Sequence, residues 1–378
     1  MTGPPLLLAV ALDGGGHHPA AHATDPFDAG YWARLAAMAE RGGIDLVTIE
    51  DTFGPPRRRD PVTVRPDAAL VAARVAPLTR HVGLMPVITT THTEPFHVAS
   101  ITATLDHISR GRAGWQPRVS VRPEEAELVG ARSAPSGDEA FAEAADVVEV
   151  VRRLWDSWED DAIVQDLATG RYIDRDKVHY VDFEGGTFSV KGPSIVPRPP
   201  QGQPVVGVLA HVPEADDLAA RGADLVFVTP APGDAAARVA EIRAAEARVG
   251  RIGEPLRVVA DLVVFLDATA SAAAARRDRL DARLGREWRT DAAVFTGTDT
   301  ELSELLLAGR DAGLDGWRLR PGEMAPDLAG IAGGVAAALR AAGARPEPAG
   351  DGPGAAPDGL RARLGLPRPA NRYTGSGR

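Results

Sequence analysis

The chain has 378 residues, of which 44% are hydrophobic and 25% are charged, and its formal net charge at pH 7 is -10. This is ordinary globular usage, which excludes a chain that is disordered throughout. The acidic balance lacks the basic footprint of proteins that bind nucleic acid or anionic membranes, and the absence of cysteine excludes disulfide scaffolds, thiol nucleophiles and thiolate metal sites.

The N-terminal part of the sequence is not expected to contain a secretory signal or a membrane span. No stretch approaches the roughly 18 apolar residues of a membrane span. The apolar run 6–12 has no basic residue before it and is followed by Asp13 and three glycines, which is not typical of a secretory signal. We therefore expect a cytoplasmic protein.

Short apolar runs alternate with amphipathic segments over the first 158 residues. This periodicity predicts strands over residues 6–11, 46–49, 82–87 and 112–116, and helices over residues 31–41, 68–76, 95–108 and 138–158. Residues 159–204 break the alternation, because they are polar, rich in Asp, Gly and Pro, and contain hairpin-like pieces at 178–183 and 187–190. They are predicted to form an insertion folded outside the main domain.

The alternation resumes after the insertion. Strands are predicted over residues 205–209, 225–228, 256–266 and 316–319, and helices over residues 214–221, 234–249, 271–284, 300–312 and 326–341. From residue 344 the chain is rich in Pro and Gly, which predicts an extended C-terminal tail over 344–378.

Eight predicted strands, each followed by a helix, indicate an α/β protein with parallel pairing and right-handed crossovers. Such units close most naturally into a (β/α)8 TIM barrel, here a single domain over 1–343 with the insertion 159–204 after the fourth helix. The competing architecture is a doubly wound open sheet, which carries a glycine fingerprint opening a helix after its first strand. Glycines 14–16 do follow the first strand, but His17 and Pro19 come next and no helix begins there.

In a barrel the functional site lies at the C-terminal ends of the strands. Polar residues gather after several of the predicted strands: Glu50, Asp51, Thr91, His92, Thr93, Gln116, Arg118, Ser120 and His211. Loops are polar because they lie at the surface, which explains any single one of these residues. Their coincidence at four strand ends predicts an active-site mouth.

A metal site is one alternative, with His17, His18, Asp51 and His92 as imidazole and carboxylate ligands. Adjacent histidines point in different directions on an extended chain, and no His-Glu-x-x-His spacing is present. A serine nucleophile has less support, since no Gly-x-Ser-x-Gly occurs. Glu50 and Asp51 are chain neighbours, so at most one of the two side chains is expected to enter the barrel.

Six stretches of the sequence carry family-specific motifs, and they run through most of the chain. They are residues 18–21 (His-Pro-Ala-Ala), 94–97 (Glu-Pro-Phe-His), 104–109 (Thr-Leu-Asp-His-Ile-Ser), 111–115 (Gly-Arg-Ala-Gly-Trp), 154–158 (Leu-Trp-Asp-Ser-Trp) and 364–373 (Leu-Gly-Leu-Pro-Arg-Pro-Ala-Asn-Arg-Tyr). Together they resemble the bacterial luciferase-like flavin-dependent monooxygenases, in particular the branch of nitrilotriacetate, sulfur-compound and long-chain alkane monooxygenases.

The resemblance implies a barrel, usually a homodimer, that takes reduced FMN from a separate flavin reductase and oxygenates a small organic substrate with O2. It implies that Asp51, Gln116 and Ser120 hold the flavin ring and ribityl chain. Four further cofactor-binding candidates are Thr91, Thr93, Arg118 and His211. Arg118 lies two residues beyond Gln116, so period-two alternation predicts that both side chains face the barrel mouth, where Arg118 either binds the phosphate or fills the flavin space and pairs with Glu50 or Asp51. His211 begins the segment before the next helix and can contact a phosphate when protonated. His18 and His92 are the catalytic candidates, as proton donor or acceptor, because imidazole titrates near neutral pH. No metal is implied.

The cofactor-facing residues depart from the family pattern more than the scaffold does. Gln116 stands where the family has Asn, and Val119 precedes Ser120 where the family has Thr. The phosphate-binding positions are Phe141, His211 and Val212, in place of hydroxyl-bearing residues. We therefore expect weak binding of oxidised FMN. The alternatives are a flavin-free family member, acting as a binding or partner subunit or as a cofactor-independent enzyme, and a metal-dependent barrel hydrolase.

Overall fold

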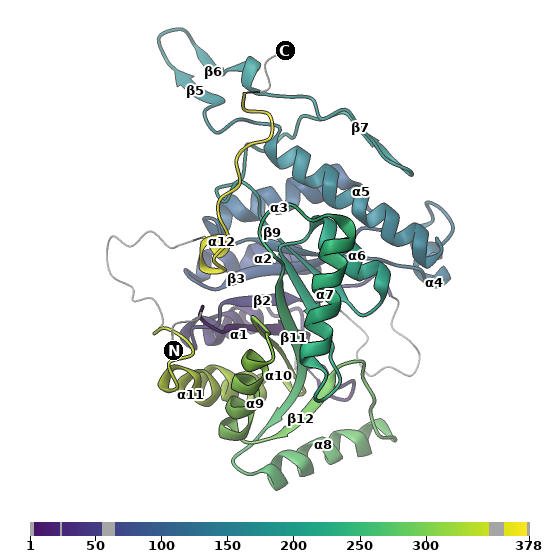
Figure 1. Ribbon diagram of the computed structural model, residues 1–378, viewed down its shortest axis with the longest axis vertical. Coiled ribbons are helices and arrows are strands. Elements are labelled where there is room, and N and C mark those ends of the chain that lie inside the picture. Colours follow the sequence, from purple (N-terminus) through teal and green to yellow (C-terminus); the bar gives the residue numbers. More distant parts are fainter. Residues whose placement is uncertain (1–3, 23–24, 55–64, 348–358, 376–378) are drawn as a thin grey trace.

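The structure is a computed structural model that describes residues 4–22, 25–54, 65–347 and 359–375, and its centre is a closed ring of parallel strands (Figure 1). In order around the ring the strands are β1 (Leu7–Leu12), β2 (Leu46–Ile49), β3 (Gly83–Thr89), β4 (Gly114–Arg118), β9 (Val205–Ala210), β10 (Leu225–Val228), β11 (Arg257–Leu266) and β13 (Gly316–Pro321). The last strand, β13, pairs with β1 and closes the ring. The predicted TIM barrel is confirmed, because an open doubly wound sheet would leave two edge strands.

Helices connect the barrel strands, and all but α4 lie close to predicted positions. They are α1 (Ala29–Arg41), α2 (Ala68–Val75), α3 (Pro95–Ser109), α4 (Pro123–Val129), α5 (Gly137–Asp156), α6 (Pro213–Gly222), α7 (Ala235–Val249), α8 (Ala270–Leu284), α9 (Asp299–Asp311), α10 (Met324–Gly330) and α11 (Ala336–Ala341). A π-helical turn, Ile331–Val335, joins α10 to α11, where a single helix was predicted. In the described part of the chain, no helix combines the length and apolar character needed to cross a membrane.

One strand beside the barrel was not predicted. β12 (Ala293–Gly297) pairs in parallel with the C-terminal half of β11, with Ala293 opposite Leu262. The N-terminal half of β11 pairs with β10 instead. β12 therefore extends the sheet beyond the end of β10 and stands outside the ring of eight.

The insertion contributes no strand to the barrel sheet. It forms two small antiparallel hairpins, β5 (Ile163–Asp166) with β6 (Arg171–Ile173), and β7 (Phe183–Glu184) with β8 (Ser189–Val190). Figure 1 shows both hairpins at one end of the molecule, beyond α5. The predicted hairpin pieces overlap the second hairpin, and the first was not predicted.

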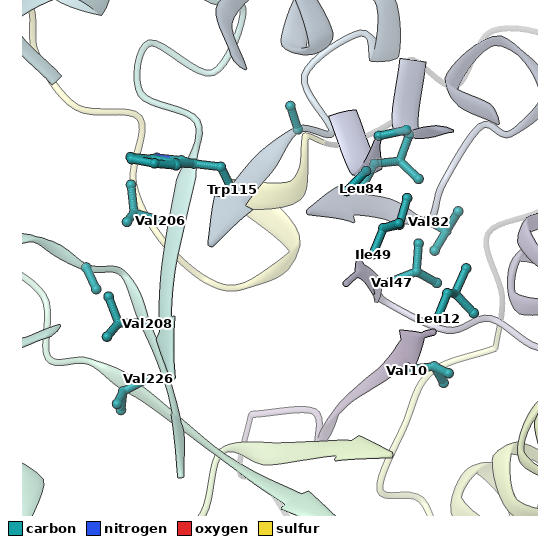
Figure 2. Packing of buried hydrophobic residues seen from close by; sticks show 14 of the residues in the cluster. Val10, Leu12, Val47, Ile49, Val82, Leu84, Trp115, Val206, Val208 and Val226 are labelled. Carbon is teal, nitrogen blue, oxygen red and sulfur yellow. The ribbon is translucent and has the colours of Figure 1, made fainter. Parts of the chain in front are cut away.

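Alternation along the barrel strands creates an outer and an inner set of side chains. Figure 2 shows outward-pointing residues from successive strands, among them Val10, Val47, Leu84, Trp115 and Val206. These pack against the helices and make the main core. The inner side chains differ between the two ends of the barrel. They are apolar at the N-terminal end and largely charged at the C-terminal end.

The C-terminal segment closes the N-terminal end of the barrel. Residues 359–375 contain a short helix, α12 (Leu360–Arg363), which the sequence did not predict within the expected tail. Leu360, Leu364 and Leu366 are buried against inner residues of the barrel strands. A Cβ on Gly83 would lie 2.6 Å from the Leu360 side chain, so this close approach requires glycine at position 83. Part of the predicted tail, residues 348–358 and 376–378, lies outside the described residues.

Candidate functional site

A cavity of about 710 Å³ opens where the barrel strands end. Asp13, Glu50 and His211 each follow the last residue of a barrel strand, and Gln116 and Arg118 lie at the end of β4; all five line the cavity. This is the end of a TIM barrel at which active sites form. The volume lies within the range of about 300–1,000 Å³ that is usual for cofactor and ligand sites.

The cavity has an apolar wall and a charged wall. Val208, Leu209, Val212 and Phe141 supply apolar surface from β9 and the helices beside it. The charged lining comes from the ends of other strands and the loops after them: Asp13, Glu50, Asp51, Arg65, Arg118, Arg122, Glu125, Asp291 and Arg320. A flat, partly polar ligand finds both kinds of surface here.

An arginine and an aspartate form the charged interior below the cavity. The Arg318 guanidinium donates to both carboxylate oxygens of Asp261, with N···O distances of 2.6 Å each, and both side chains are fully buried. Arg318 also lies over the Phe227 ring, 3.9 Å from its centroid. Burial by itself raises the pKa of Asp261, but Arg318 and Arg320 outweigh burial and hold that pKa below its ordinary value.

Arg320 shares the same aspartate and reaches the cavity lining. It donates to Asp261 and to Nε2 of His17, the latter over 3.3 Å, and its guanidinium lies 3.7 Å from the Asp291 carboxylate. Burial, reinforced by the positive charge of Arg320, lowers the pKa of His17 to about 3. His17 is therefore neutral at physiological pH and accepts this hydrogen bond.

Of the neighbouring carboxylates Glu50 and Asp51, Glu50 is the one that faces the buried network. Its carboxylate lies 3.9 Å from Arg318. The Asp51 carboxylate instead accepts from the backbone N–H of Thr52 at 2.7 Å and of Ala68 at 2.9 Å, which ties the loop after β2 to the start of α2. Burial raises the pKa of Asp51.

Arg118 spans part of the cavity mouth. Its Nη1 donates to the backbone carbonyl of Asp51 over 2.7 Å, and its guanidinium is 4.0 Å from Glu125. Gln116 and Arg118 both line the cavity, as the period-two alternation of β4 predicts. Burial lowers the pKa of Arg118, yet the group stays charged because arginine titrates so high.

The Ser120 side chain is hydrogen-bonded to a buried carboxylate. Its hydroxyl donates to Glu125, which is 1% exposed and also accepts from Thr52 over 3.3 Å and from Arg122 over 3.4 Å. The backbone N–H of Ser120 donates to the Thr91 hydroxyl over 3.0 Å. Ser120 lines the cavity, whereas Thr91 lies behind it and supports the loop.

The two predicted catalytic histidines are absent from the cavity lining. His18 is fully buried; its Nδ1 accepts from the Ala20 N–H, and its Nε2 is 3.1 Å from Asp281. His92 has a left-handed backbone (φ 68°), and burial followed by the Arg132 charge lowers its pKa. Both ring nitrogens of His92, and the hydroxyl of Thr93, are buried without a partner among the described residues. Their functional roles stay predictions.

The remaining candidates meet at one end of the cavity. His211 is exposed at the rim, next to Val212 and close to Phe141 across the cavity. Val212 is the N-cap of α6 and provides no side-chain cap, which leaves part of that helix terminus open. His211 is thus the one ionisable side chain among the three predicted phosphate-binding positions, Phe141, His211 and Val212.

Sequence reasoning missed the groups that shape the charged interior, namely Asp13, Glu125, Asp261, Arg318 and Arg320. The signal for three of them was present: Arg318 and Arg320 alternate within a barrel strand, and Asp261 interrupts the apolar run of β11. Of the residues weighed as metal ligands, His17, His18 and Asp51 make other contacts. The described ranges contain no group of three or more His, Asp or Glu side chains arranged to hold a metal ion.

Comparison with known proteins adds the family. The family model for luciferase-like monooxygenases matches residues 9–343. Nitrilotriacetate monooxygenase component A of Aminobacter aminovorans is 34% identical over 277 residues, 70% of this chain and 61% of that protein. The N-acetyl-S-(2-succino)cysteine monooxygenase of Bacillus subtilis is 34% identical over 283 residues, 73% of this chain and 64% of that protein. The match thus spans less than two thirds of the length of either relative.

Solved structures agree on the architecture. A long-chain alkane monooxygenase superimposes with a TM-score of 0.84 at 22% identity, covering 96% of both chains. A riboflavin lyase crystallised with modified FMN and riboflavin gives a TM-score of 0.83 at 24% identity, covering 98% of both chains. At these identities the likeness establishes the fold alone.

Proposed function

Because the chain belongs to the luciferase-like monooxygenase family, whose members are flavin-dependent oxygenases of small organic substrates, we propose that it uses reduced FMN and O2 to oxygenate such a substrate. The observation that carries this proposal is the cavity of about 710 Å³ at the C-terminal end of the barrel, with one apolar and one charged wall. The flavin-free alternative is not favoured by the relatives found.

The lining residues fit a flavin. The apolar side chains of Val208, Leu209 and Val212 suit the face of a planar ring system, and the Gln116 amide supplies a polar contact for its edge. Arg118 and His211 are two of the positively charged or protonatable lining residues that would donate to a phosphate, Arg118 after leaving the Asp51 carbonyl. Reduced flavin, when bound, supplies the electrons that activate O2.

Proton transfer is assigned to a group that lines the cavity. Burial raises the pKa of Asp13 to about 6, and the nearby Glu50 charge adds to the increase against the lowering effect of Arg65. A general acid–base group works best when its pKa is near the working pH. Asp13 is therefore better placed for this role than His18, whose ring nitrogens are both engaged.

Binding experiments under anaerobic conditions test the flavin assignment. The protein is titrated with oxidised FMN and separately with photoreduced FMN, with bound flavin measured by ultrafiltration. We expect oxidised FMN to bind weakly, since the hydroxyl-bearing phosphate positions of the family are replaced, and the titration with reduced FMN shows whether the form needed for the reaction binds. Failure of both forms to bind in the millimolar range overturns the proposal.

A separate flavin reductase is the proposed source of the reduced cofactor. One relative is named as component A of its enzyme, and another is named as a subunit of pristinamycin IIA synthase, so related chains occur within multicomponent systems. We further propose a homodimer, as the family resemblance implies. Light scattering at micromolar concentration is expected to give twice the chain mass, and a monomeric mass contradicts this.

A further inference from the structure

The orientation of Arg318 in the barrel interior is set by contacts on three of its sides. Its Nε and Nη2 donate to the two carboxylate oxygens of Asp261, and its plane lies over the Phe227 ring. A bidentate pair fixes both the position and the plane of a guanidinium. The remaining Nη1 then points in a determined direction, toward β4.

That remaining group fixes the amide of Gln116. Nη1 of Arg318 donates to Oε1 of Gln116 over 2.7 Å. A guanidinium has no acceptor atom, so Gln116 can present only its carbonyl oxygen to it. The usual ambiguity between the oxygen and the nitrogen of a side-chain amide is thereby removed.

The amide nitrogen of Gln116 is left facing elsewhere. Gln116 is 4% exposed and lines the cavity, and its Nε2 has no hydrogen-bond partner among the described residues. Because this amide group borders the cavity, a ligand bound there can supply its acceptor. The floor of the cavity therefore offers an N–H donor whose direction is set from behind.

We propose that Asp261 and Arg318 are positioning residues that hold Gln116 as a hydrogen-bond donor to a carbonyl oxygen on the edge of the flavin ring. This inference rests on the proposed function, because the flavin provides the acceptor. All three side chains belong to barrel strands. Asp261 and Arg318 lie on β11 and β13, and Gln116 lies on β4 on the other side of the barrel.

A double-mutant cycle on FMN binding tests the proposal. Gln116→Met removes the donor at nearly constant volume, and Arg318→Gln releases the amide while Arg320 still pairs with Asp261. We expect Gln116→Met to weaken FMN binding about tenfold, the effect of one lost hydrogen bond, and to shift the visible flavin spectrum. Arg318→Gln is expected to weaken binding in the wild-type background and to have no further effect once Gln116 is replaced.

The outcomes distinguish a wrong role for Gln116 and Arg318 from a wrong proposed function. If wild-type protein binds FMN but Gln116→Met changes neither the dissociation constant nor the spectrum, the donor role is wrong. If the two substitutions act additively, Arg318 does not work through Gln116. If wild-type protein binds neither redox form of FMN, the proposed function and this inference fall together. Arg248→Gln, on the exposed side of α7 and outside the cavity lining, is the matched control and should leave the spectrum unchanged. Should Arg318→Gln fail to fold, Gln116→Met alone decides the donor role.

Discussion

The role of Arg118 distinguishes two predictions for the cavity: the side chain either binds the phosphate or fills the flavin space. Its side chain crosses to the Asp51 carbonyl instead of remaining free for a ligand, and it lies 4.0 Å from Glu125. A charge-assisted hydrogen bond of this kind contributes roughly 1.5–3 kcal/mol. A phosphate must therefore compete with contacts that Arg118 already makes.

Replacing Arg118 by alanine is expected to strengthen the binding of oxidised FMN severalfold, because it opens the mouth that the guanidinium now spans. Fluorescence quenching in an FMN titration measures the change. Arg248→Ala is the control, since Arg248 is an exposed arginine of α7 outside the cavity lining. Tight binding by the wild type that is lost in Arg118→Ala would instead identify Arg118 as a phosphate clamp.

Asp13 links the cavity to pH-dependent stability. Its folded-state pKa of about 6 exceeds the ordinary value of 3.8, because burial disfavours the carboxylate. The stabilising contribution of the protonated form is complete below pH 3.8 and is lost as the pH rises through 6. Asp13→Asn should therefore be more stable than the wild type at pH 8, by about 1–3 kcal/mol, with the difference vanishing near pH 4.

Urea unfolding at the two pH values measures this difference. A loss of stability in Asp13→Asn at pH 8 would mean that the ion pair with Arg65, 3.2 Å away, outweighs the cost of burial. An equal effect at both pH values would show that Asp13 does not titrate between them.

For single residues, the sequence predicts which face of a strand a side chain occupies but not which residue it contacts. Alternation on β4 placed Gln116 and Arg118 together at the cavity, and that is what the structure has. The contact of Gln116 with Arg318 joins residues 202 positions apart. Such pairing depends on barrel closure and register, which local periodicity does not contain.

Elements within the regular alternation of apolar runs and amphipathic segments were predictable, and elements outside it were not. Strands β2 and β10 have the predicted bounds, and most helix ends shift by one or two residues. β12 and α12 were missed because each is an extra element outside that alternation and is stabilised by tertiary contacts. The final helix was predicted as continuous, but a π turn interrupts it at Gly334, whose Cβ would collide with the Asp299 side chain of α9.

The role of α12 as an element can be measured through one side chain. Leu360 is fully buried at the N-terminal end of the barrel, packed with Leu46, Met85 and neighbouring inner residues. Leu360→Ala should lower the free energy of unfolding by about 2–5 kcal/mol, as read from the urea midpoint. Leu167→Ala, at a hairpin position that is 97% exposed, should change it little. Equal effects of the two substitutions would contradict the closing role of α12.

The whole molecule is held together by contacts between distant parts of the chain. β1 pairs with β13, so the two ends of the domain share one sheet. Beyond α12 the chain runs from the barrel to the start of the insertion, where Asn371 donates to the carbonyls of Asp156 and Trp158, at the end of α5, at 2.7 and 2.8 Å. In Figure 1 this segment extends from α12 toward the β5–β6 hairpin.

Two truncations distinguish the two roles of the C-terminal segment 359–375, which are closing the barrel and holding the insertion. Ending the chain after residue 347 removes three buried leucines, each contributing about 1.5–3 kcal/mol. Because a domain has only about 5–15 kcal/mol in total, this form should unfold at much lower urea. Ending the chain after residue 366 keeps α12 and its leucines and loses the contacts of Asn371 and the Arg368–Asp160 pair. The barrel should then keep most of its stability, while proteolysis within 159–204 becomes faster, because the insertion loses its tether. Equal urea midpoints for the two truncated forms would show that α12 does not close the barrel.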